Sequence, residues 1–249
     1  MAVYVAVLAI VFGFAVPASA EDRPSDPFGN HTIELNKEAR LVEIWESLRD
    51  QVLLDKVHFH SCIESGSNTD CESVSTLMKI VEEARQNQGK ALLGHLNRSI
   101  NLMIKAAPGH LTGPLDVITT REGDCKSYSI AKYAAARVAG FSADHVRLVS
   151  VHDRRHHFDH MVAAVYQNEE WLILDNLTNL LLRDSEKRDY EPTAFWTTGV
   201  PGAIFRRAGG GNAGDFAVSI RLFPCRHKLL VAASRLPAAR CRKFRRPSR

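Results

Sequence analysis

Three residues of the chain have the types and the order that suit catalysis by a thiol. Cys125 lies at the start of an apolar helical run, in the segment Gly123-Asp-Cys-Lys-Ser-Tyr128. His160 opens one expected strand, and Asp175 closes the next. A thiol nucleophile needs a base that takes its proton and a third group that orients the base. We therefore predict a catalytic triad of Cys125, His160 and Asp175.

The position of Cys125 at a helix start favours the ionised form of its sulfur. Unpaired N–H groups and the positive end of the helix dipole lie at a helix N-terminus, and both stabilise a thiolate. We expect the backbone N–H of Cys125 to be one oxyanion donor, whereas the sequence identifies no side-chain donor. Taken singly, the three residues fit a buried thiol, a strand histidine and a turn-capping aspartate. Their joint order favours catalysis.

The elements that position these residues begin with helices. Apolar residues recur at helical spacing in four segments, 35–57, 73–86, 90–106 and 125–138. Pro114 predicts that residues 109–123 are irregular. The last helix is rich in alanine, which suits close packing of a helix against a sheet. Cys125 is expected at the N-terminus of this helix.

The hydrophobic period changes to two in the second half of the chain. This alternation predicts strands at 145–151, 160–166 and 170–174. The short connection between the last two predicts a hairpin. Helices followed by strands indicate an α+β domain over residues 35–203, in which the nucleophile helix packs on a small antiparallel sheet.

The N-terminus has the features of an export signal. Residues 3–16 are apolar and uncharged, and Ala18-Ser-Ala20 follows them, which predicts a signal peptide at residues 1–20. An N-terminal membrane anchor is the alternative, but a span needs about 20 apolar residues. We therefore expect a periplasmic or secreted protein with no stable membrane span after signal removal. Residues 21–34 contain Pro24, Pro27 and Gly29, and predict a flexible leader.

The cysteine content fits an oxidising compartment. The chain has five cysteines, and Cys62 and Cys71 flank a polar loop between two helical patterns. A disulfide between them would close this loop, although two unpaired thiols also fit the sequence. With that pair joined, we expect Cys125 to be the free thiol of a thiol enzyme. Cys225 and Cys241 lie in the C-terminal tail.

The charge of the chain is concentrated at its C-terminus. Residues 204–249 carry twelve Lys or Arg against one acid, whereas the whole chain has 32 bases and 28 acids. This glycine- and arginine-rich segment has no hydrophobic periodicity, which predicts a disordered basic tail. A nucleic-acid-binding arm is the alternative. Because the basic residues of the tail have almost no aromatic interleaving and exported proteins rarely meet nucleic acid, we expect no nucleic-acid partner.

A group of imidazoles and carboxylates surrounds His160 in the sequence. Its members are His152, Asp153, His156, His157, Asp159 and His160. Such groups can bind zinc, but Arg154 and Arg155 lie among them and the spacing matches no closed structural zinc site. We interpret the segment as a solvated loop between two strands.

Several motifs together resemble the bacterial transglutaminase-like cysteine peptidases, which have a papain-like core. The main ones are Gly123-Asp-Cys-Lys-Ser-Tyr-Ser-Ile-Ala-Lys-Tyr133, Asp159-His-Met-Val-Ala-Ala164 and Trp171-Leu-Ile-Leu-Asp-Asn176. The Asn97-Arg-Ser-Ile-Asn101 helix and the loop between Cys62 and Cys71 are also similar. The resemblance covers about residues 35–190.

The resemblance implies a papain-like or transglutaminase-like fold and a Cys125, His160 and Asp175 triad. Studied relatives are periplasmic proteases that cut surface adhesins, and some of them need calcium. The implied function is hydrolysis of peptide bonds in a protein substrate, with a surface adhesin as one candidate. A transglutaminase or deamidase acting on glutamine would use the same thioester. A catalytically impaired protein-binding homologue is also an open alternative.

Two departures from the family pattern concern calcium. Ser127 replaces an aspartate that relatives usually carry, and Lys126 stands where calcium-dependent members have an acid. A cation beside Asp124 would repel calcium and pair with the Asp124 carboxylate. Asp124 is therefore a weak candidate calcium ligand, and we expect the protein to need no metal or other cofactor.

Overall fold

The computed structural model describes residues 25–29, 32–34, 40–65, 71–109, 111–196 and 202–204. The predicted signal peptide and nearly all of the basic tail lie outside the described residues. Within the expected leader, Pro27–Gly29 form a 3-10 turn (η2) and Thr32–Glu34 form strand β1. Among the described helices, none is both long enough and apolar enough to cross a membrane.

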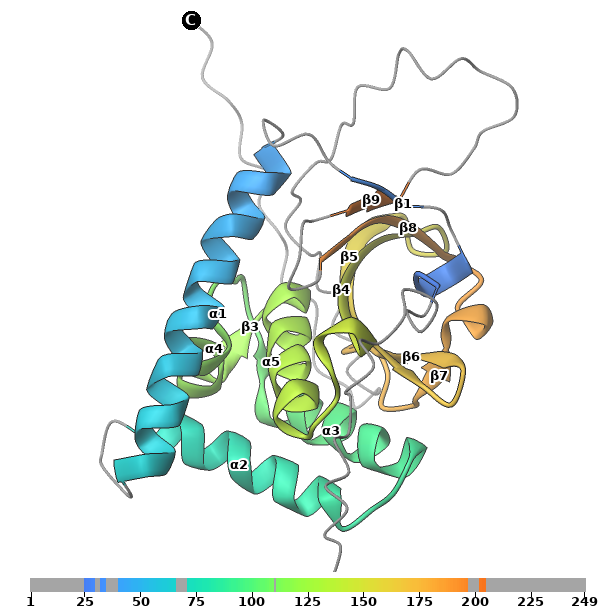
Figure 1. The fold of residues 1–249 in the computed structure, drawn as a ribbon. Coiled ribbons are helices and arrows are strands. Elements are labelled where there is room, and N and C mark those ends of the chain that lie inside the picture. Colours follow the sequence, from blue (N-terminus) through green and yellow to red (C-terminus); the bar gives the residue numbers. More distant parts are fainter. Residues whose placement is uncertain are drawn as a thin grey trace, which may run out of the picture.

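Helices make up most of the first half of the described chain (Figure 1). They are α1 (Arg40–Ser65), α2 (Glu72–Arg85), α3 (Lys90–Met103), α4 (Pro114–Thr120) and α5 (Cys125–Val138). Helix α2 shows the pattern that drives their packing. Its buried residues, Val74, Leu77, Val81 and Ala84, recur every three or four positions and form one apolar face.

Helix α4 differs from the irregular segment that we expected at 109–123. Pro114 is the first residue of the helix, where its missing N–H costs nothing and its fixed φ suits helical geometry. The Asp55 carboxylate of α1 accepts a hydrogen bond from the Leu115 N–H at 2.8 Å. Arg121, with φ of 53°, ends the helix in the left-handed region. The proline thus starts a helix here, whereas our prediction treated it as a breaker.

Within the described residues, the strands form one seven-stranded antiparallel sheet and a two-stranded parallel pair. The large sheet has the order β1-β9-β8-β4-β5-β6-β7, and β2 pairs with β3. The strands after β1 are β2 (Lys105–Ala106), β3 (Glu122–Gly123), β4 (Val146–Asp153), β5 (Phe158–Gln167), β6 (Glu170–Leu174), β7 (Leu182–Arg183), β8 (Tyr190–Trp196) and β9 (Gly202–Ile204). The predicted strands correspond to β4, β5 and β6. The expected α+β fold is confirmed, with a larger sheet than predicted.

The predicted hairpin joins β5 to β6. Its two connecting residues, Asn168 and Glu169, both have positive φ, at 52° and 63°. Positive φ at both central residues defines the type I′ turn that suits the right-handed twist of paired strands. Strand β8 was not predicted because Pro192 interrupts its pattern. Pro192 pairs with Val151 where the register between β4 and β8 shifts, and such irregularities tolerate proline.

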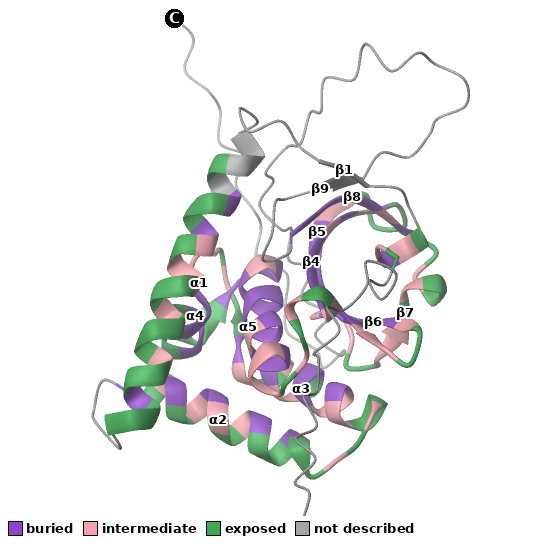
Figure 2. Ribbon diagram, in the orientation of Figure 1, coloured by how far each residue is buried: buried purple, intermediate pink, exposed green. Residues whose placement is uncertain are grey.

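Helix α5 is the central helix and packs against β5 and β4 of the curved sheet (Figure 1). It is buried along most of its length (Figure 2). Along β5, Met161, Ala163 and Val165 pack with the helices, whereas Val162 and Ala164 belong to a second apolar cluster. The sheet is therefore buried on both faces. This arrangement brings the N-terminus of α5 to the edge of the core beside the start of β5.

Candidate active site

His160 and Asp175 lie together because they stand on neighbouring strands. His160 is on β5, and Asp175 directly follows β6, which pairs with β5. The His160 Nε2 atom is 2.9 Å from Asp175 Oδ1. The two residues are only 3% and 0% exposed. The structure therefore joins the predicted base to its predicted orienting carboxylate.

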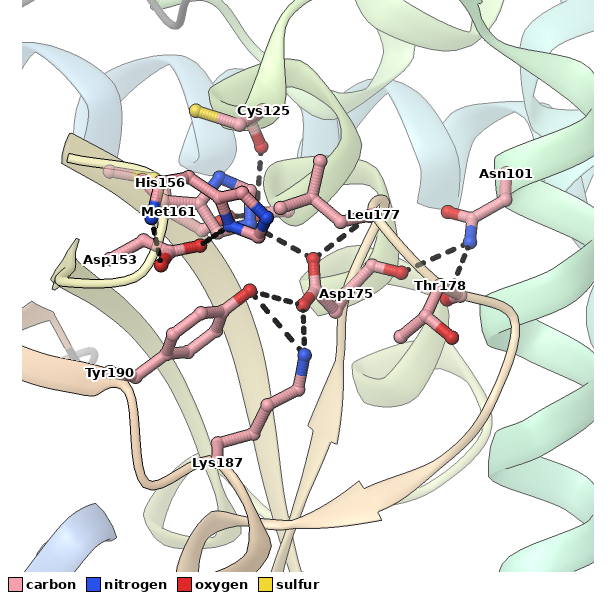
Figure 3. A network of polar contacts seen from close by, with 12 residues as sticks. Asn101, Cys125, Asp153, His156, Met161, Asp175, Leu177, Thr178, Lys187 and Tyr190 are labelled. Atoms are coloured by element: carbon pink, nitrogen blue, oxygen red, sulfur yellow. Dashed lines mark hydrogen bonds and ion pairs between the residues drawn. The ribbon is translucent and has the colours of Figure 1, made fainter. Parts of the chain in front are cut away.

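The Asp175 carboxylate accepts hydrogen bonds from four groups (Figure 3). On Oδ1, the partner besides His160 is the Leu177 N–H, at 2.9 Å. On Oδ2, the Lys187 Nζ and the Tyr190 hydroxyl each lie at 2.6 Å. Burial alone would raise the pKa of Asp175, but His160 and Lys187 overcome this and hold its pKa well below the usual range. Asp175 is therefore a carboxylate at neutral pH.

Tyr190 is a neutral donor in this network. Burial and the neighbouring Asp175 carboxylate raise the pKa of Tyr190, so its hydroxyl keeps its proton. The ring also lies edge-on to the His160 imidazole, with ring centres 5.8 Å apart. Phe158 packs against the same imidazole at 5.7 Å. These rings restrict the orientation of His160.

Two asparagines of α3 hold the turn that follows Asp175. The Asn97 Nδ2 donates to the Thr178 carbonyl at 3.0 Å. The Asn101 Nδ2 lies 3.0 Å from the Asp175 carbonyl and 3.1 Å from that of Thr178 (Figure 3). Helix α3 therefore fixes the backbone on which the carboxylate stands.

Cys125 is the first residue of α5, as predicted. Asp124 is the N-cap, and its Oδ1 accepts the Lys126 N–H at 3.0 Å. One turn further along, the Ser129 hydroxyl lies 2.8 Å from the carbonyl oxygens of both Cys125 and Met161. A hydroxyl has a single proton, so it is shared between these two acceptors. Ser129 thereby ties the backbone of Cys125 to the residue that follows His160.

The two ring nitrogens of His160 have different surroundings. Its Nε2 contacts Asp175, whereas its buried Nδ1 has no hydrogen-bond partner among the described residues. In the neutral ring, a proton on Nε2 is donated to the carboxylate and leaves Nδ1 as a base. This is the tautomer that a nucleophile's proton acceptor requires.

The expectation that Cys125 is a free thiol is wrong for this structure. Cys125 is disulfide-bonded. Cys62 and Cys71 are joined to each other. A sulfur in a disulfide cannot act as the attacking thiolate until the bond is reduced. The predicted bridge between Cys62 and Cys71 is confirmed.

Asp124 does not fit a calcium site. Besides accepting the Lys126 N–H at Oδ1, it forms an ion pair with the Lys126 ammonium at Oδ2. Both side chains are largely buried, so the pair is shielded from water. Calcium needs several oxygen ligands with net negative charge. The predicted pairing of Lys126 with Asp124 is confirmed, and the Lys126 ammonium stands where a calcium ion would need net negative charge.

The histidines near His160 form separate pairs with carboxylates. His152 Nδ1 is 2.8 Å from Asp159 Oδ1, and His156 Nδ1 is 2.7 Å from Asp153 Oδ2. Burial opposes ionisation of Asp153, but its bonds from His156 lower its pKa overall. A closer group of possible metal donors is His58, Cys62 and Cys71, but its two sulfurs are joined in the disulfide.

Our sequence analysis missed Lys187, Tyr190, Ser129 and Lys132. Lys132 lies two turns after Cys125 on α5, fully buried, and its Nζ has no hydrogen-bond partner among the described residues. Burial, partly opposed by Asp175, lowers the pKa of Lys132 to about 7. Lys132 could have been noticed in the sequence, because it is a charged residue within an alanine-rich apolar helix. Lys187 lies in a run of alternating charges, where no local pattern distinguishes one lysine.

The comparisons with known proteins agree with this fold. A family model described as bacterial transglutaminase-like cysteine proteinase, BTLCP, matches residues 56–193, more than half of the chain. Calcium-bound LapG of Legionella pneumophila is 19% identical and has a TM-score of 0.50, with 65% of this chain and 93% of that chain covered. EGTA-treated LapG is 18% identical, with a TM-score of 0.49 and coverages of 70% and 92%. At these identities the likeness concerns the fold. No curated protein matches the chain.

Proposed function

Because the chain belongs to the bacterial transglutaminase-like cysteine proteinase family, we propose that it hydrolyses peptide bonds with Cys125, His160 and Asp175. The observation that carries this proposal is the orientation of His160. Its Nε2 is bound to a buried carboxylate, and its Nδ1 has no hydrogen-bond partner in the described part of the chain. That orientation, next to the first turn of α5, suits a base for a thiol at a helix N-terminus.

In the proposed reaction, His160 takes the Cys125 proton, and the thiolate attacks the carbonyl carbon of the scissile bond. His160 then gives the proton to the leaving amine as the C–N bond breaks, which leaves a thioester on Cys125. A water molecule gives a proton to His160 and attacks the thioester, the acid product leaves, and the proton returns to the sulfur. Asp175 holds the imidazole and stabilises its protonated form.

This chemistry belongs to the reduced protein. The disulfide at Cys125 occupies the sulfur that must attack. Reduction by a thiol would release a thiolate, and the N-terminal position on α5 would stabilise that charge. The proposed active state is therefore the state in which Cys125 is reduced, and every activity measurement must control the redox state.

The proposed substrate is a protein outside the cytoplasm, with a surface adhesin as one candidate. The disulfide between Cys62 and Cys71 supports an oxidising compartment, and hence a periplasmic or secreted location. Lys126 bound to Asp124 supports activity without calcium at that position. If the thiolate instead attacked a glutamine side chain and released ammonia, the same kind of thioester would form. Its transfer to an amine would make the protein a transglutaminase, and its hydrolysis would make it a deamidase.

The test is a peptide library treated with reduced protein and analysed by mass spectrometry. Hydrolysis creates new termini, deamidation converts glutamine to glutamate, and transglutamination creates cross-linked peptides. We expect new termini with the wild-type protein and none with Cys125→Ala or His160→Gln. Modified glutamines without new termini would replace the peptidase with one of the alternatives. A wild-type protein that changes no peptide, and whose Cys125 is unreactive toward iodoacetamide, would favour the impaired binding homologue.

A further inference from the structure

The buried carboxylate of Asp175 is shared between two basic side chains. Its Oδ1 lies 2.9 Å from His160 Nε2, and its Oδ2 lies 2.6 Å from Lys187 Nζ. Asp175 is fully buried, and the Lys187 side chain is only 14% exposed. A single negative charge therefore faces the Lys187 ammonium on one side and, on the other, an imidazole that must gain and lose a proton in the proposed reaction.

Lys187 is also held in place by Tyr190. Its ammonium lies 3.4 Å from the Tyr190 hydroxyl and 4.5 Å from the centre of the ring. The hydroxyl itself donates to the same carboxylate oxygen, at 2.6 Å. Orienting the carboxylate toward His160 needs no positive charge, because Tyr190 and the Leu177 N–H already hold it. The charge of Lys187 therefore does more than hold the carboxylate in place.

We propose that Lys187 tunes His160 through Asp175, and this inference rests on the triad chemistry proposed above. The ammonium neutralises part of the carboxylate charge, so the imidazolium that forms during the reaction is held less tightly. A less stabilised imidazolium returns its proton to the leaving amine more readily. Lys187 is thus a positioning residue that sets the proton affinity of the base without touching the substrate.

Other ionisable groups act on the same cluster. The buried Lys132 of α5 interacts electrostatically with Asp175, and Asp153 of β4 interacts electrostatically with Tyr190 of β8. Cys125 is the proposed partner of His160. Lys132 is the group most easily confused with Lys187, because it is a second lysine near the same carboxylate. Any test must therefore change the two lysines separately.

A cavity of about 440 Å³ borders this cluster. Lys187, Tyr190, Arg154 and Arg188 are among the residues that line it. Because Lys187 borders this cavity, its truncation opens a space that small molecules can enter. A small alkylammonium ion should occupy the position of the missing ammonium in Lys187→Ala.

The experiment measures the titration of His160 directly, by NMR of the ¹³C-labelled imidazole. It uses the Cys125→Ala background, so that neither the disulfide nor the thiolate affects the result, and His160→Gln assigns the signal. We expect Lys187→Met to raise the pH midpoint of His160 by about one pH unit, since a nearby cation disfavours the imidazolium. Lys187→Arg should stay close to the parent, and millimolar ethylammonium should move Lys187→Ala back toward it.

The matched control is Lys132→Met, which removes the other lysine. An unchanged midpoint in a folded Lys187→Met protein would overturn the inference, and so would an equal shift in Lys187→Arg. If Lys187→Met does not fold, Lys187→Ala with and without ethylammonium gives the same comparison. The titration needs no activity. If the His160 midpoint shifts but the reduced wild-type protein cleaves no peptide, the proposed function is refuted and the effect of Lys187 on His160 stands. If the wild-type protein cleaves peptides but the midpoint does not shift, the proposed function stands and the effect of Lys187 is refuted.

Discussion

Lys126 occupies both oxygens of the Asp124 carboxylate, through its backbone N–H at Oδ1 and through its ammonium at Oδ2. The N-cap of the nucleophile helix is therefore bound to a cation supplied by the chain itself. Two unit charges about 4 Å apart interact by roughly 4 kcal/mol at an effective dielectric of 20. A calcium ion at Asp124 would have to displace this interaction.

We accordingly expect that a calcium chelator leaves activity unchanged and that millimolar calcium gives little thermal stabilisation. Lys126→Glu should raise calcium affinity by at least tenfold, because it replaces a cation with a ligand. Calorimetric titration measures this directly. Lys56→Glu, an exposed site of α1 with the same change of charge, is the control and should gain no comparable affinity. Inactivation of the wild-type protein by chelation, reversed by calcium, would show that its calcium ligands lie elsewhere.

The disulfide at Cys125 leads to a redox prediction. We expect the oxidised protein to be inactive and to gain activity on treatment with dithiothreitol, because only the reduced sulfur can attack. Peptide cleavage before and after reduction is the measurement, with Cys125 alkylation followed by mass spectrometry. A reductant also opens the bridge between Cys62 and Cys71. In the Cys62→Ala, Cys71→Ala double variant, peptide cleavage should therefore still require the reductant. Equal cleavage by this variant with and without reductant would contradict the prediction.

Gly123 is needed because its neighbour leaves no room for a side chain. A Cβ at Gly123 would overlap the Cβ and Oγ of Ser127, in the first turn of the nucleophile helix. We expect Gly123→Ala to lower stability by about 1–3 kcal/mol and to reduce activity by shifting that turn. Urea unfolding and peptide cleavage measure the two effects.

The matched control for Gly123→Ala is Gly94→Ala, in α3. A Cβ there meets nothing within 4 Å, so the helix should gain about 0.5–1 kcal/mol. Equal effects at the two glycines would argue against a steric role for Gly123.

Lys132 makes the stability of the protein depend on pH. Its pKa is lowered to about 7 by burial, so between pH 7 and its ordinary value near 10.5 the unfolded chain binds a proton that the native state does not. Stability should therefore rise with pH in this window, by up to roughly 1.4 kcal/mol per pH unit. Below pH 7 the amine is charged in both states, so the native state bears the full free-energy cost of burying that charge.

Lys132→Met should remove this dependence and be more stable than the wild type at pH 7. The difference in unfolding free energy between Lys132→Met and the wild type should be smaller at pH 9 than at pH 7, as measured by urea unfolding at the two pH values. Lys79→Met, on the exposed side of α2, is the control and should show a difference that does not change with pH. A stability difference for Lys132→Met that is equal at pH 7 and pH 9 would contradict the expected titration.

Local features of this chain could be predicted because their causes lie within a few residues. Cys125 begins α5 because Asp124 caps it, and the Asp124 carboxylate is next to the Lys126 that binds it. The pairing of β5 with β6 follows from strands joined by a two-residue turn, so His160 and Asp175 had to lie close together. Cys62 and Cys71 flank a single short loop. In each case, short separation along the chain leaves few alternatives.

The tertiary structure decided what depends on distant segments. Lys187 and Tyr190 reach Asp175 because the segment after β7 returns to place β8 beside β4, a strand order that no local pattern encodes. A hydrophobic period defines which face of an element is buried, but the energy that selects its neighbours comes from packing across the whole domain. The triad candidates could be identified from the sequence, whereas the charges that surround Asp175 could not.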